Sequence, residues 1–506
     1  MTYLPRADIA SNTLEFETEA LIKPTGFREY DARWWFGTPG SDKVPELNLN
    51  GVQALGLGLG TLIHELGVEP KIVVGHDYRA YSLSVKQALE VGLMAAGIEV
   101  HDIGLALSPT AYFAQFDLDI PCVAMVTASH NNNGWTGVKM GVEPPLTFGP
   151  DEMSRLKTIV LDGLGRTRPG GGYVQEDGVR ERFIADLSSG KKLTRPLKVV
   201  AACGNGTAGA FAQKALEAMG AHVIPLDCEL DHSFPRYNPN PEDMEMLHAV
   251  RDAVIEHGAD VGLAFDGDGD RCGVVDNEGE EIFADKVGLM LARDLSEIYP
   301  GATFVVDVKS TGLFLTDPIL KANDAKTIYW KTGHSYIKRK SKEEGALAGF
   351  EKSGHFFMQP PIGRGYDDGL VAGRAVLEML DRNPGKSMAD LRRALPVSYS
   401  SPTMSPKCTD EGKYAIVDKI AAEYADMAET GRLIAGRKIA GTITVNGVRF
   451  ILEDGAWGLV RASSNTPNLV IVVESMTSNA DMKAIFADIE ARLARHPEIG
   501  EFDQKI

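Results

Sequence analysis

Apolar and polar positions alternate along the chain in a pattern that repeats three times. In each repeat, an apolar run of about five residues precedes a stretch with an apolar residue every three or four positions, and a second apolar run follows. The runs predict buried strands and the intervening stretch predicts a helix. Three such units predict three related α/β domains with mixed, mostly parallel sheets. Their strands and helices are expected at 71–75, 82–96, 99–103, 197–201, 210–219, 222–226, 303–307, 313–321 and 326–330.

The last hundred residues follow a different pattern. Helices are expected at 411–427 and 478–493, a hairpin with an Asn-Gly turn at 438–451, and a further strand at 468–473. Paired strands with helices to one side predict a small C-terminal α+β domain. The stretch 396–406 holds three prolines and four serines and is predicted to be a linker.

These patterns divide the chain into four expected domains. The first begins with a polar arm over about the first 25 residues. The expected boundaries are 1–192, 193–300, 301–400 and 401–506.

Composition narrows the class of protein. The chain has 506 residues, of which 44% are hydrophobic and 24% charged, as in ordinary globular proteins. A net charge of −18 argues against nucleic-acid binding, but screening lets a local basic cluster hold an anionic substrate. No apolar run is long enough for a signal peptide or a membrane span, so no membrane partner is expected. Five scattered cysteines without close pairs predict reduced thiols in a cytoplasmic protein, with no disulfide framework and no zinc site.

A polar loop follows the apolar run at 122–126. Ser129 stands beside His130 there, ahead of three asparagines. A serine beyond a strand end, among hydrogen-bond donors, suits a nucleophile or a phosphate carrier. An Asn/Gly turn with a capping serine is the alternative that these residues leave open.

Three carboxylates occupy alternate positions directly after another apolar run. Asp266, Asp268 and Asp270 are separated by glycines, which let the backbone bend and bring the carboxylates to one point. Their mutual repulsion favours a hard cation such as Mg²⁺. An EF-hand is excluded because Arg271 and Asn277 occupy the positions that need Gly and Glu. A phosphatase with an Asp nucleophile and a solvated acidic turn are the alternatives.

A glycine-rich turn, GNGTAG at 204–209, lies between an expected strand and an expected helix. Asp227 ends the next strand 18 residues later. This arrangement matches the dinucleotide fingerprint and supports a different class of function, an NAD-dependent dehydrogenase. Any tight strand-to-helix turn also favours glycine for steric reasons, so the turn alone is weak evidence.

Two further loops carry polar side chains. GFEKSGH at 349–355 combines an acid, a hydroxyl and an imidazole that suit sugar hydroxyls, although it could equally be an ordinary polar turn. RASSNTP at 461–467 offers one fixed cation and four small polar residues that fit a phosphate dianion. A turn with capping hydroxyls is the alternative for this second loop.

Taken together, these motifs resemble the α-D-phosphohexomutase family, the phosphomannomutases and phosphoglucomutases. The resemblance covers nearly the whole chain, because four motifs occur in the family's order, one in each expected domain. It implies three related α/β domains and a fourth α+β domain around a central active-site cleft. The motifs are TASHN at 127–131, DGDGDR at 266–271, GFEKSGH at 349–355 and RASSNTP at 461–467.

The resemblance implies a role for each motif. Ser129 would be the phosphorylated serine, and its phosphate would hold Mg²⁺ together with Asp266, Asp268 and Asp270. Arg271 would lie over the same phosphate. The implied sugar-binding residues are Lys309, His334, Glu351, Ser353 and His355. The implied residues for the non-reacting phosphate are Arg461, Ser463, Asn465 and Thr466.

Proton transfer is implied for two cations. Arg33 and Lys139 match family positions that handle the proton of the attacking or leaving sugar oxygen. We expect burial and a neighbouring arginine to lower the proton affinity of Lys139. His130 would support the serine loop.

The implied reaction interconverts hexose 1-phosphates and hexose 6-phosphates through the phosphoserine and a hexose 1,6-bisphosphate. The same bisphosphate would act as activator, beside Mg²⁺, and hexose phosphates would be the partners of a monomer or homodimer. The EKSGH loop is most similar to that of enzymes acting on both mannose and glucose phosphates. Phosphoglucosamine mutase, an NAD-dependent dehydrogenase and a non-catalytic sugar-phosphate sensor are the alternatives.

Two departures from the family pattern concern loop geometry. The phosphate loop of the family usually reads RxSGT or RxSNT, and here Ser464 and Asn465 stand in the last places before the threonine. We expect phosphate binding with altered geometry. Asn132 and Asn133 stand where many relatives have prolines, which removes one source of rigidity from the serine loop.

Overall fold

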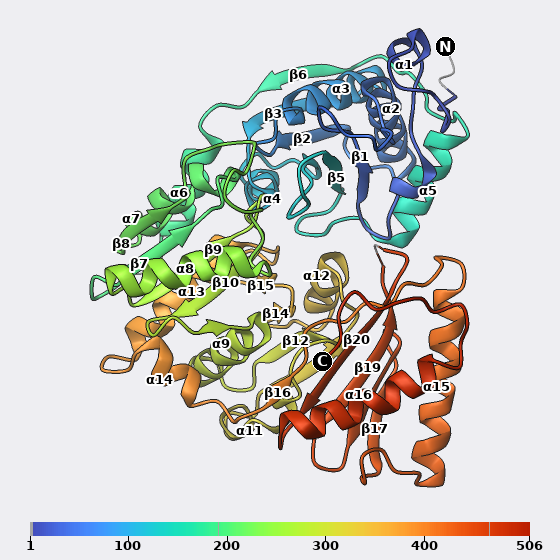
Figure 1. Ribbon diagram of the computed structural model, residues 1–506. Helices are drawn as coiled ribbons and strands as arrows, with labels where there is room; N and C mark the ends of the chain where they lie inside the picture. The colour runs from blue at the N-terminus through green and yellow to red at the C-terminus, as the bar shows by residue number, and fades with distance from the viewer. Residues whose placement is uncertain (1–3, 191, 465) are drawn as a thin grey trace. The chain divides into compact units, whose positions relative to one another are not determined.

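The computed structural model describes residues 4–190, 192–464 and 466–506 (Figure 1). No helix within these ranges is both long and apolar enough to span a membrane. The chain folds into two compact units, each built from two separate segments. The first unit contains Met1–Ala284 and Ser353–Ala389, and the second contains Asp285–Lys352 and Asp390–Ile506.

The first unit opens with a six-stranded mixed sheet in the order β1-β5-β4-β2-β3-β6. Strands β4, β2, β3 and β6 are parallel neighbours, and β5 and β1 are antiparallel at one edge. The strands are β1 (Ala32–Trp35), β2 (Lys71–His76), β3 (Glu99–Leu105), β4 (Cys122–Val126), β5 (Trp135–Gly141) and β6 (Gly172–Gln175). The helices are α1 (Leu14–Thr18), α2 (Leu49–Glu65), α3 (Ser82–Ala95), α4 (Ser108–Asp117), α5 (Pro150–Leu161) and α6 (Val179–Ser188).

Glycines on α2 let this helix lie directly against α3 (Figure 1). A Cβ atom at Gly56 would stand 2.2 Å from the carbonyl oxygen of Leu89, and one at Gly92 would stand 2.1 Å from that of Gln53. Larger residues would therefore push the helices apart. Helix α2 was not predicted, because glycines in a helical stretch usually indicate a turn.

A second sheet of the first unit has the order β11-β10-β9-β7-β8. Its strands are β7 (Lys198–Ala202), β8 (His222–Leu226), β9 (Val261–Phe265), β10 (Cys272–Asp276) and β11 (Glu281–Ile282). Further elements of this unit are α7 (Ala212–Ala218), α8 (Met244–His257), β15 (Phe356–Met358), which lies outside this sheet, and α13 (Gly369–Arg382), which packs against β9 and β10.

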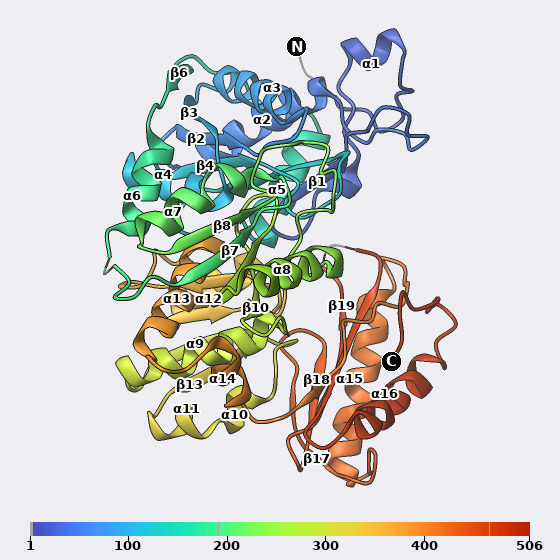
Figure 2. The ribbon, with the colours of Figure 1, turned by 60° about the vertical axis from the view of Figure 1, so that its left-hand side comes forward.

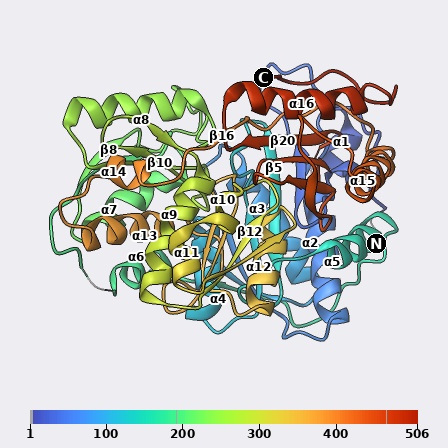
Figure 3. The same ribbon diagram turned by 90° about the horizontal axis from the view of Figure 1, so that it is seen from below.

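The second unit contains a parallel sheet in which β12 pairs with β13 and β14. Figure 3 shows α12 beside β12. The strands are β12 (Thr303–Asp307), β13 (Lys326–Trp330) and β14 (Ala348–Phe350). The helices are α9 (Ala284–Ile298), α10 (Leu313–Thr316), α11 (Pro318–Ala322), α12 (His334–Glu343) and α14 (Met388–Arg393), of which α9 and α14 begin in the first unit.

An antiparallel sheet with the order β16-β20-β19-β18-β17 completes the second unit. Helices α15 and α16 share one apolar core with this sheet (Figure 2). The elements are α15 (Lys413–Thr430), β16 (Tyr399–Ser400), β17 (Ile439–Ile443), β18 (Val448–Leu452), β19 (Trp457–Ala462), β20 (Leu469–Ser475) and α16 (Asn479–Leu493).

The predicted fold class is confirmed, and most predicted elements lie within two or three residues of their observed bounds. The predicted helix at 313–321 is two short helices, because Asp317 caps a new turn ahead of a proline. The predicted linker at 396–406 is wrong, since β16 pairs with β20 and Met404 bridges Ile471. The predicted polar arm is also partly buried, at Ala20, Leu21 and Ile22.

Buried charges fasten the antiparallel sheet to the loop that follows β12. Glu474 is fully buried and accepts hydrogen bonds from Lys286 Nζ at 2.9 Å, Gly312 N at 2.7 Å and Trp457 Nε1 at 2.6 Å. Arg449 is also fully buried and donates to the carbonyl oxygens on either side of Lys309, those of Val308 and Ser310. Buried hydrogen bonds therefore join the loop and the sheet within the second unit.

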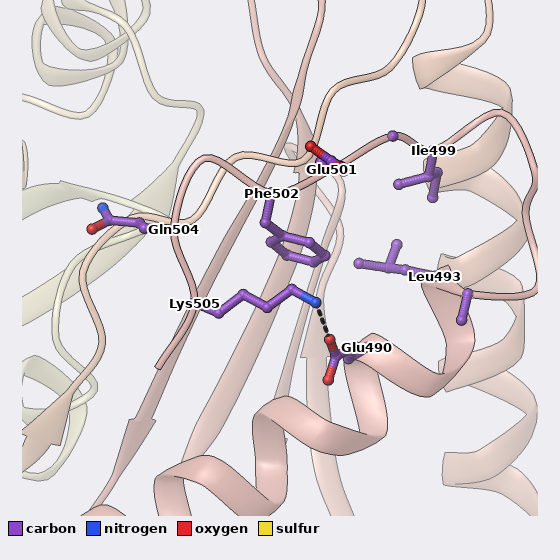
Figure 4. Close-up of a pocket in the computed structure, with 9 residues that line it drawn as sticks. Glu490, Leu493, Ile499, Glu501, Phe502, Gln504 and Lys505 are labelled. Atoms are coloured by element: carbon purple, nitrogen blue, oxygen red, sulfur yellow. Dashed lines mark hydrogen bonds and ion pairs between the residues drawn. The ribbon is translucent and has the colours of Figure 1, made fainter.

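The last residues of the chain fold back beside α16. They line an open pocket of about 650 Å³ together with residues of α16, among them Leu493 and Phe502 (Figure 4). Lys505 pairs with Glu490 across it at 2.5 Å. This pocket shares no residue with the motifs identified from the sequence.

A buried carboxyl group on α3 makes stability depend on pH. Glu90 is 4% exposed and lies 3.5 Å from Lys86 Nζ, which also pairs with Asp102. Burial raises the pKa of Glu90 from 4.5 to about 7. The folded protein therefore binds more protons than the unfolded chain between these values, and stability falls as pH rises through that window.

Glu90→Gln should remove this dependence, because the amide carries no charge. We expect the variant to be more stable than the wild type at pH 8 by roughly 1–2 kcal/mol, discounted for partial solvation, and nearly equal at pH 5. Calorimetric melting at both pH values measures the difference. Equal shifts at pH 5 and pH 8 would contradict the assignment to Glu90.

Candidate functional site

Ser129 occupies a tight turn beyond β4. Its backbone has a φ of 54°, which is rare for a residue other than glycine, and its side chain is buried. Its Oγ lies 3.2 Å from His130 Nδ1 and 3.4 Å from Asp266 Oδ2. The serine hydroxyl therefore stands between an imidazole and a carboxylate.

Two residues that the sequence did not reveal hold this loop. Arg79 donates to the carbonyl oxygens of Ser129 at 2.8 Å, Asn131 at 2.7 Å and Asn132 at 3.2 Å. Asp77 Oδ2 receives hydrogen bonds from Arg79 Nε at 3.2 Å and from Ala128 N at 3.2 Å, among others. Arg79 thus restrains the loop that lacks the family's prolines. Both residues follow β2, so their position after a parallel strand was the available signal.

The three aspartates of 266–270 converge as predicted. All three are fully buried, and one carboxylate oxygen of each lies within 4.8 Å of the others. The Oδ1 atom of Asp268 has no hydrogen-bond partner among the described residues, and that of Asp270 has His355 Nε2 at 3.4 Å as its near neighbour. A Cβ atom at Gly267 would stand 2.7 Å from the carbonyl oxygen of Ser129, so glycine lets this loop reach the serine loop. The donor set fits a hard divalent cation.

Lys139 lies among these carboxylates. Its Nζ donates to Asp268 Oδ2 at 2.7 Å, to Ser108 Oγ at 3.2 Å and to Asp270. Burial opposes the charge on Lys139, but the two carboxylates outweigh it and raise its pKa well above the ordinary value. The prediction that its proton affinity is lowered is therefore wrong for this arrangement, because carboxylates surround the ammonium group.

The carboxylates themselves differ in proton affinity. Burial and the charges of Asp270 and Asp268 raise the pKa of Asp266 well above its ordinary value. Burial also disfavours the charge on Asp270, but Lys139 and His355 overcome it and hold the pKa of Asp270 well below the usual range. One group of the cluster thus holds a proton more readily than another.

Two arginines and a histidine complete this part of the site. Arg33 pairs with Asp31 at 2.8 Å and donates to Asn131 Oδ1 at 2.8 Å. Burial, followed by the charges of Arg271 and Arg33, lowers the pKa of His130 well below its ordinary value. The imidazole of His130 is therefore neutral at pH 7.

Ser353 and His355 belong to the same unit as the aspartates. His355 Nδ1 lies 3.0 Å from Ser353 Oγ, and its Nε2 lies 3.4 Å from Asp270 Oδ1 and 3.3 Å from Arg271 Nε. Asp367, which the sequence did not single out, forms a second close group with Asp270 and His355. The end of the motif at 349–355 therefore contacts the aspartate loop directly.

Lys309, His334 and Glu351 lie in the second unit. Each follows a strand of the parallel sheet, at the edge where the carboxyl ends of β12, β13 and β14 meet. His334 and Glu351 are buried, and a carboxylate oxygen of Glu351 accepts from Gly333 N. Asp307, missed in the sequence, is fully buried and lies 3.9 Å from Lys309 Nζ.

The RASSNTP motif, whose first residues end β19, also lies in the second unit. Arg461 donates to Asn446 Oδ1 at 2.9 Å, and Ser463 Oγ accepts a hydrogen bond from the hydroxyl of Thr466 at 2.8 Å. Asn446 Oδ1 also accepts from Thr332 N at 3.3 Å, which links this loop to the residues before His334. The prediction for Asn465 falls outside the described residues. Strand β19 itself was not predicted.

The glycine-rich turn at 204–209 is unsuited to a dinucleotide. Gly206 N and Thr207 N donate to the carbonyl oxygens of Cys203 at 2.8 Å and Gly267 at 3.3 Å, so they face the protein. Asp227 accepts from Tyr237 and is engaged as well. The turn braces the aspartate loop instead.

Comparison with known proteins agrees with this geometry. Four sequence profiles match in order, described as the alpha/beta/alpha domains I, II and III and the C-terminal domain of phosphoglucomutase/phosphomannomutase. They match residues 25–164, 180–279, 283–399 and 406–492. The chain belongs to the phosphoglucomutase/phosphomannomutase family of isomerases.

Several relatives are similar over most of their length. A phosphomannomutase/phosphoglucomutase of Pseudomonas putida is 35% identical over 95% of this chain and 98% of its own. A phosphoglucomutase of Neisseria meningitidis is 32% identical over 90% and 94%. The crystal structure of a phosphoglucomutase/phosphomannomutase family protein from Burkholderia thailandensis has a TM-score of 0.83 at 30% identity, covering 95% of this chain and 99% of that one.

Proposed function

We propose that this chain interconverts the 1-phosphates and 6-phosphates of mannose and glucose, with Ser129 as the phosphate carrier. The observation that carries the proposal is the placement of Ser129 Oγ 3.4 Å from Asp266, at the edge of the buried aspartate cluster. A phosphoryl group on this oxygen would lie beside both the cation ligands and Arg271. Relatives named for both sugars support the choice of mannose and glucose.

Asp266, Asp268 and Asp270 would hold Mg²⁺ together with an oxygen of phosphorylated Ser129. The bound cation would withdraw charge from the transferring phosphoryl group. The chain's own residues orient the transfer. Arg79 fixes the serine loop, so that the bond from Ser129 Oγ to phosphorus can break in line with the attacking sugar oxygen.

His130 and Lys139 differ in protonation state and therefore suit different roles. The neutral imidazole of His130, 3.2 Å from Ser129 Oγ, can take the serine proton when the hydroxyl is phosphorylated again. Lys139 and Arg33 carry protons and suit stabilisation of the sugar oxygen and its developing charge. His355 is a further imidazole beside the aspartate loop.

Further residues would bind the rest of the substrate. The sugar hydroxyls are assigned to Lys309, His334, Glu351, Ser353 and His355. Arg461 would bind the non-reacting phosphate with Ser463, Asn465 and Thr466. A hexose 1,6-bisphosphate can then present either phosphate to Ser129, and the same compound would phosphorylate resting Ser129 as activator.

The proposed function also concerns the compartment, the oligomeric state and the cofactor of the protein. Five free cysteines favour the reducing cytoplasm. One chain carries every residue assigned above, so either a monomer or a homodimer can act. No residue of the site has a role for NAD, and the paired N–H groups of the turn at 204–209 argue against one.

The deciding experiment is turnover of mannose, glucose and glucosamine 1-phosphates with Mg²⁺ and a trace of glucose 1,6-bisphosphate. We expect mannose and glucose phosphates to react with comparable kcat/KM values and glucosamine phosphate to react poorly. A preference for glucosamine phosphate would reassign the chain to the phosphoglucosamine mutases, with the same mechanism. Binding without turnover would leave only a sugar-phosphate sensor.

Arg79→Lys tests how the serine loop is held. A lysine ammonium lacks the planar pair of nitrogen atoms from which Arg79 bonds three carbonyl oxygens, so the loop should loosen while the fold remains. We expect kcat to fall by roughly ten- to a hundredfold, which is about 1.4–2.7 kcal/mol, with a nearly unchanged KM. Arg155→Lys, which alters only an exposed ion pair with Glu65, is the matched control. Wild-type kcat in Arg79→Lys would refute the role.

Arg461→Lys tests the phosphate loop. Loss of a bidentate contact to the non-reacting phosphate should raise KM by roughly ten- to a hundredfold, with a smaller change in kcat. Steady-state kinetics with glucose 1-phosphate measure both values. Arg495→Lys, at an exposed ion pair of the same sheet domain, should leave them unchanged. An unchanged KM for Arg461→Lys would exclude the loop from phosphate binding.

A further inference from the structure

Two cysteine side chains meet outside the site described above. Cys203 follows β7 and Cys228 lies just beyond β8, and these strands are parallel neighbours. Both thiols therefore stand at the same edge of the sheet. Their Sγ atoms are 3.4 Å apart. Cys203 is fully buried, whereas Cys228 is partly exposed.

The two thiols differ in acidity. The hydrogen bond between the two sulfur atoms lowers the pKa of Cys228 and, together with burial, raises that of Cys203. The other cysteines lack such a neighbour among the described residues, and burial raises the pKa of Cys122 to about 12. Cys228 is thus both the more accessible and the more acidic thiol of the pair.

We propose that Cys203 and Cys228 form an oxidation-sensitive dithiol that peroxides convert to a disulfide. The thiolate of Cys228 attacks one peroxide oxygen, the O–O bond breaks, and water or an alcohol leaves after taking up a proton. The sulfenic acid on Cys228 is then attacked by the sulfur of Cys203. The S–S bond forms, the S–O bond breaks, and water leaves with the proton of Cys203. The peroxide gains the two electrons that the thiols lose, and an added dithiol reductant reverses the change.

A short turn connects this pair to the aspartate loop. Cys203 begins the turn, and its carbonyl oxygen accepts from Gly206 N at 2.8 Å. Thr207 N donates to the carbonyl oxygen of Gly267 at 3.3 Å, and Thr207 Oγ1 accepts from Tyr78 N at 2.8 Å. Gly267 lies between two of the proposed cation ligands. A disulfide draws the two sulfur atoms to about 2.05 Å, so we expect its formation to displace Cys203 and the turn that it begins.

Oxidation should therefore slow the reaction, and this part of the inference rests on the proposed function. We expect the movement to reach Gly267 through the hydrogen bond from Thr207 N, and Gly267 packs so closely on the serine loop that an added Cβ would stand 2.7 Å from the carbonyl oxygen of Ser129. We expect turnover to fall at least about threefold on oxidation and to recover on reduction. Formation of the disulfide itself does not depend on that function.

The test treats the purified full-length protein with hydrogen peroxide, blocks remaining thiols with N-ethylmaleimide, and maps peptides without reduction. We expect a linked peptide pair containing Cys203 and Cys228, three blocked cysteines, and turnover that dithiothreitol restores. Thiol loss without this linked pair overturns the dithiol. A linked pair with unchanged turnover overturns its connection to the site.

Variants separate these outcomes from general oxidative damage. Cys228→Ser should keep wild-type turnover, form no linked pair and resist peroxide, because the attacking sulfur is absent. Cys408→Ser, at a buried cysteine of the second unit, should respond as the wild type does. If Cys228→Ser loses turnover to peroxide as fast as the wild type, the inference fails. A protein that forms the linked pair but never turns over hexose phosphates would refute the proposed function alone.

Discussion

Ser129→Ala should lose at least about a hundredfold in kcat/KM with glucose 1-phosphate, a loss of about 2.7 kcal/mol or more in transition-state stabilisation. The reason is that alanine removes the oxygen which alternately carries and releases the phosphoryl group. The variant should still fold, because the loop is held by Arg79 through backbone carbonyl oxygens and not through the serine side chain. Radiolabelled glucose 1,6-bisphosphate should label the wild type and not the variant.

The controls distinguish a phosphate carrier from a general weakening of the site. Ser154→Ala, on the exposed face of α5, should keep both the label and the activity. Ser129→Ala should also bind substrate with an affinity close to that of the wild type, measured by calorimetry. If Ser129→Ala retains turnover while Asp266→Asn abolishes it, the chain is a phosphotransfer enzyme with an aspartate nucleophile, and the mutase mechanism is falsified.

Removal of the divalent cation should abolish turnover, and Mg²⁺ should restore it. The buried carboxylates repel one another, and Lys139 balances only part of their charge. The protein without cation should therefore lack the positive charge needed to accept a phosphoryl group in the cluster. We expect at least about a thousandfold loss on chelation, corresponding to about 4 kcal/mol.

Asp268→Asn provides the matching variant. An amide keeps the shape of the side chain but removes one negative charge, so the affinity for Mg²⁺ should fall at least about tenfold. Calorimetric titration of Mg²⁺ measures this without any turnover. Asp276→Asn, a buried aspartate on β10 outside the cluster, is the control for fold damage. Unchanged Mg²⁺ affinity in Asp268→Asn would place the cation elsewhere.

Strands could be predicted because apolar runs such as 122–126 are short, buried and bounded by turns. Helix α2 could not, since its glycines serve contacts with α3 that only the folded structure reveals. Strand β19 was missed because Arg461 and its neighbours suggested a loop, although the first residues of that motif complete a strand. The pattern of apolar residues along the chain therefore predicted those elements whose residue types are set by burial.

The site was predictable where chemistry demands several unusual residues in sequence. The aspartate triplet and the loop of Ser129 could be identified directly. Asp77, Arg79 and Asp307 could not, because each is one ordinary charged residue at or just after the end of a strand, and some of its partners lie far away in sequence. The pKa of Lys139 was predicted with the wrong sign for the same reason, since its neighbours come from another segment of the chain.

The first unit is built from two separate segments of the chain, and the ribosome makes them at different times. Gly369 N bonds to the carbonyl oxygen of Gly269, and His355 contacts Asp270, so the aspartate loop depends on residues 353–389. A ribosome must translate 285–352, which belong to the other unit, before that support emerges. The nascent chain therefore completes its proposed cation site late, and, if that proposal holds, an early pause in translation should yield a chain that cannot retain Mg²⁺.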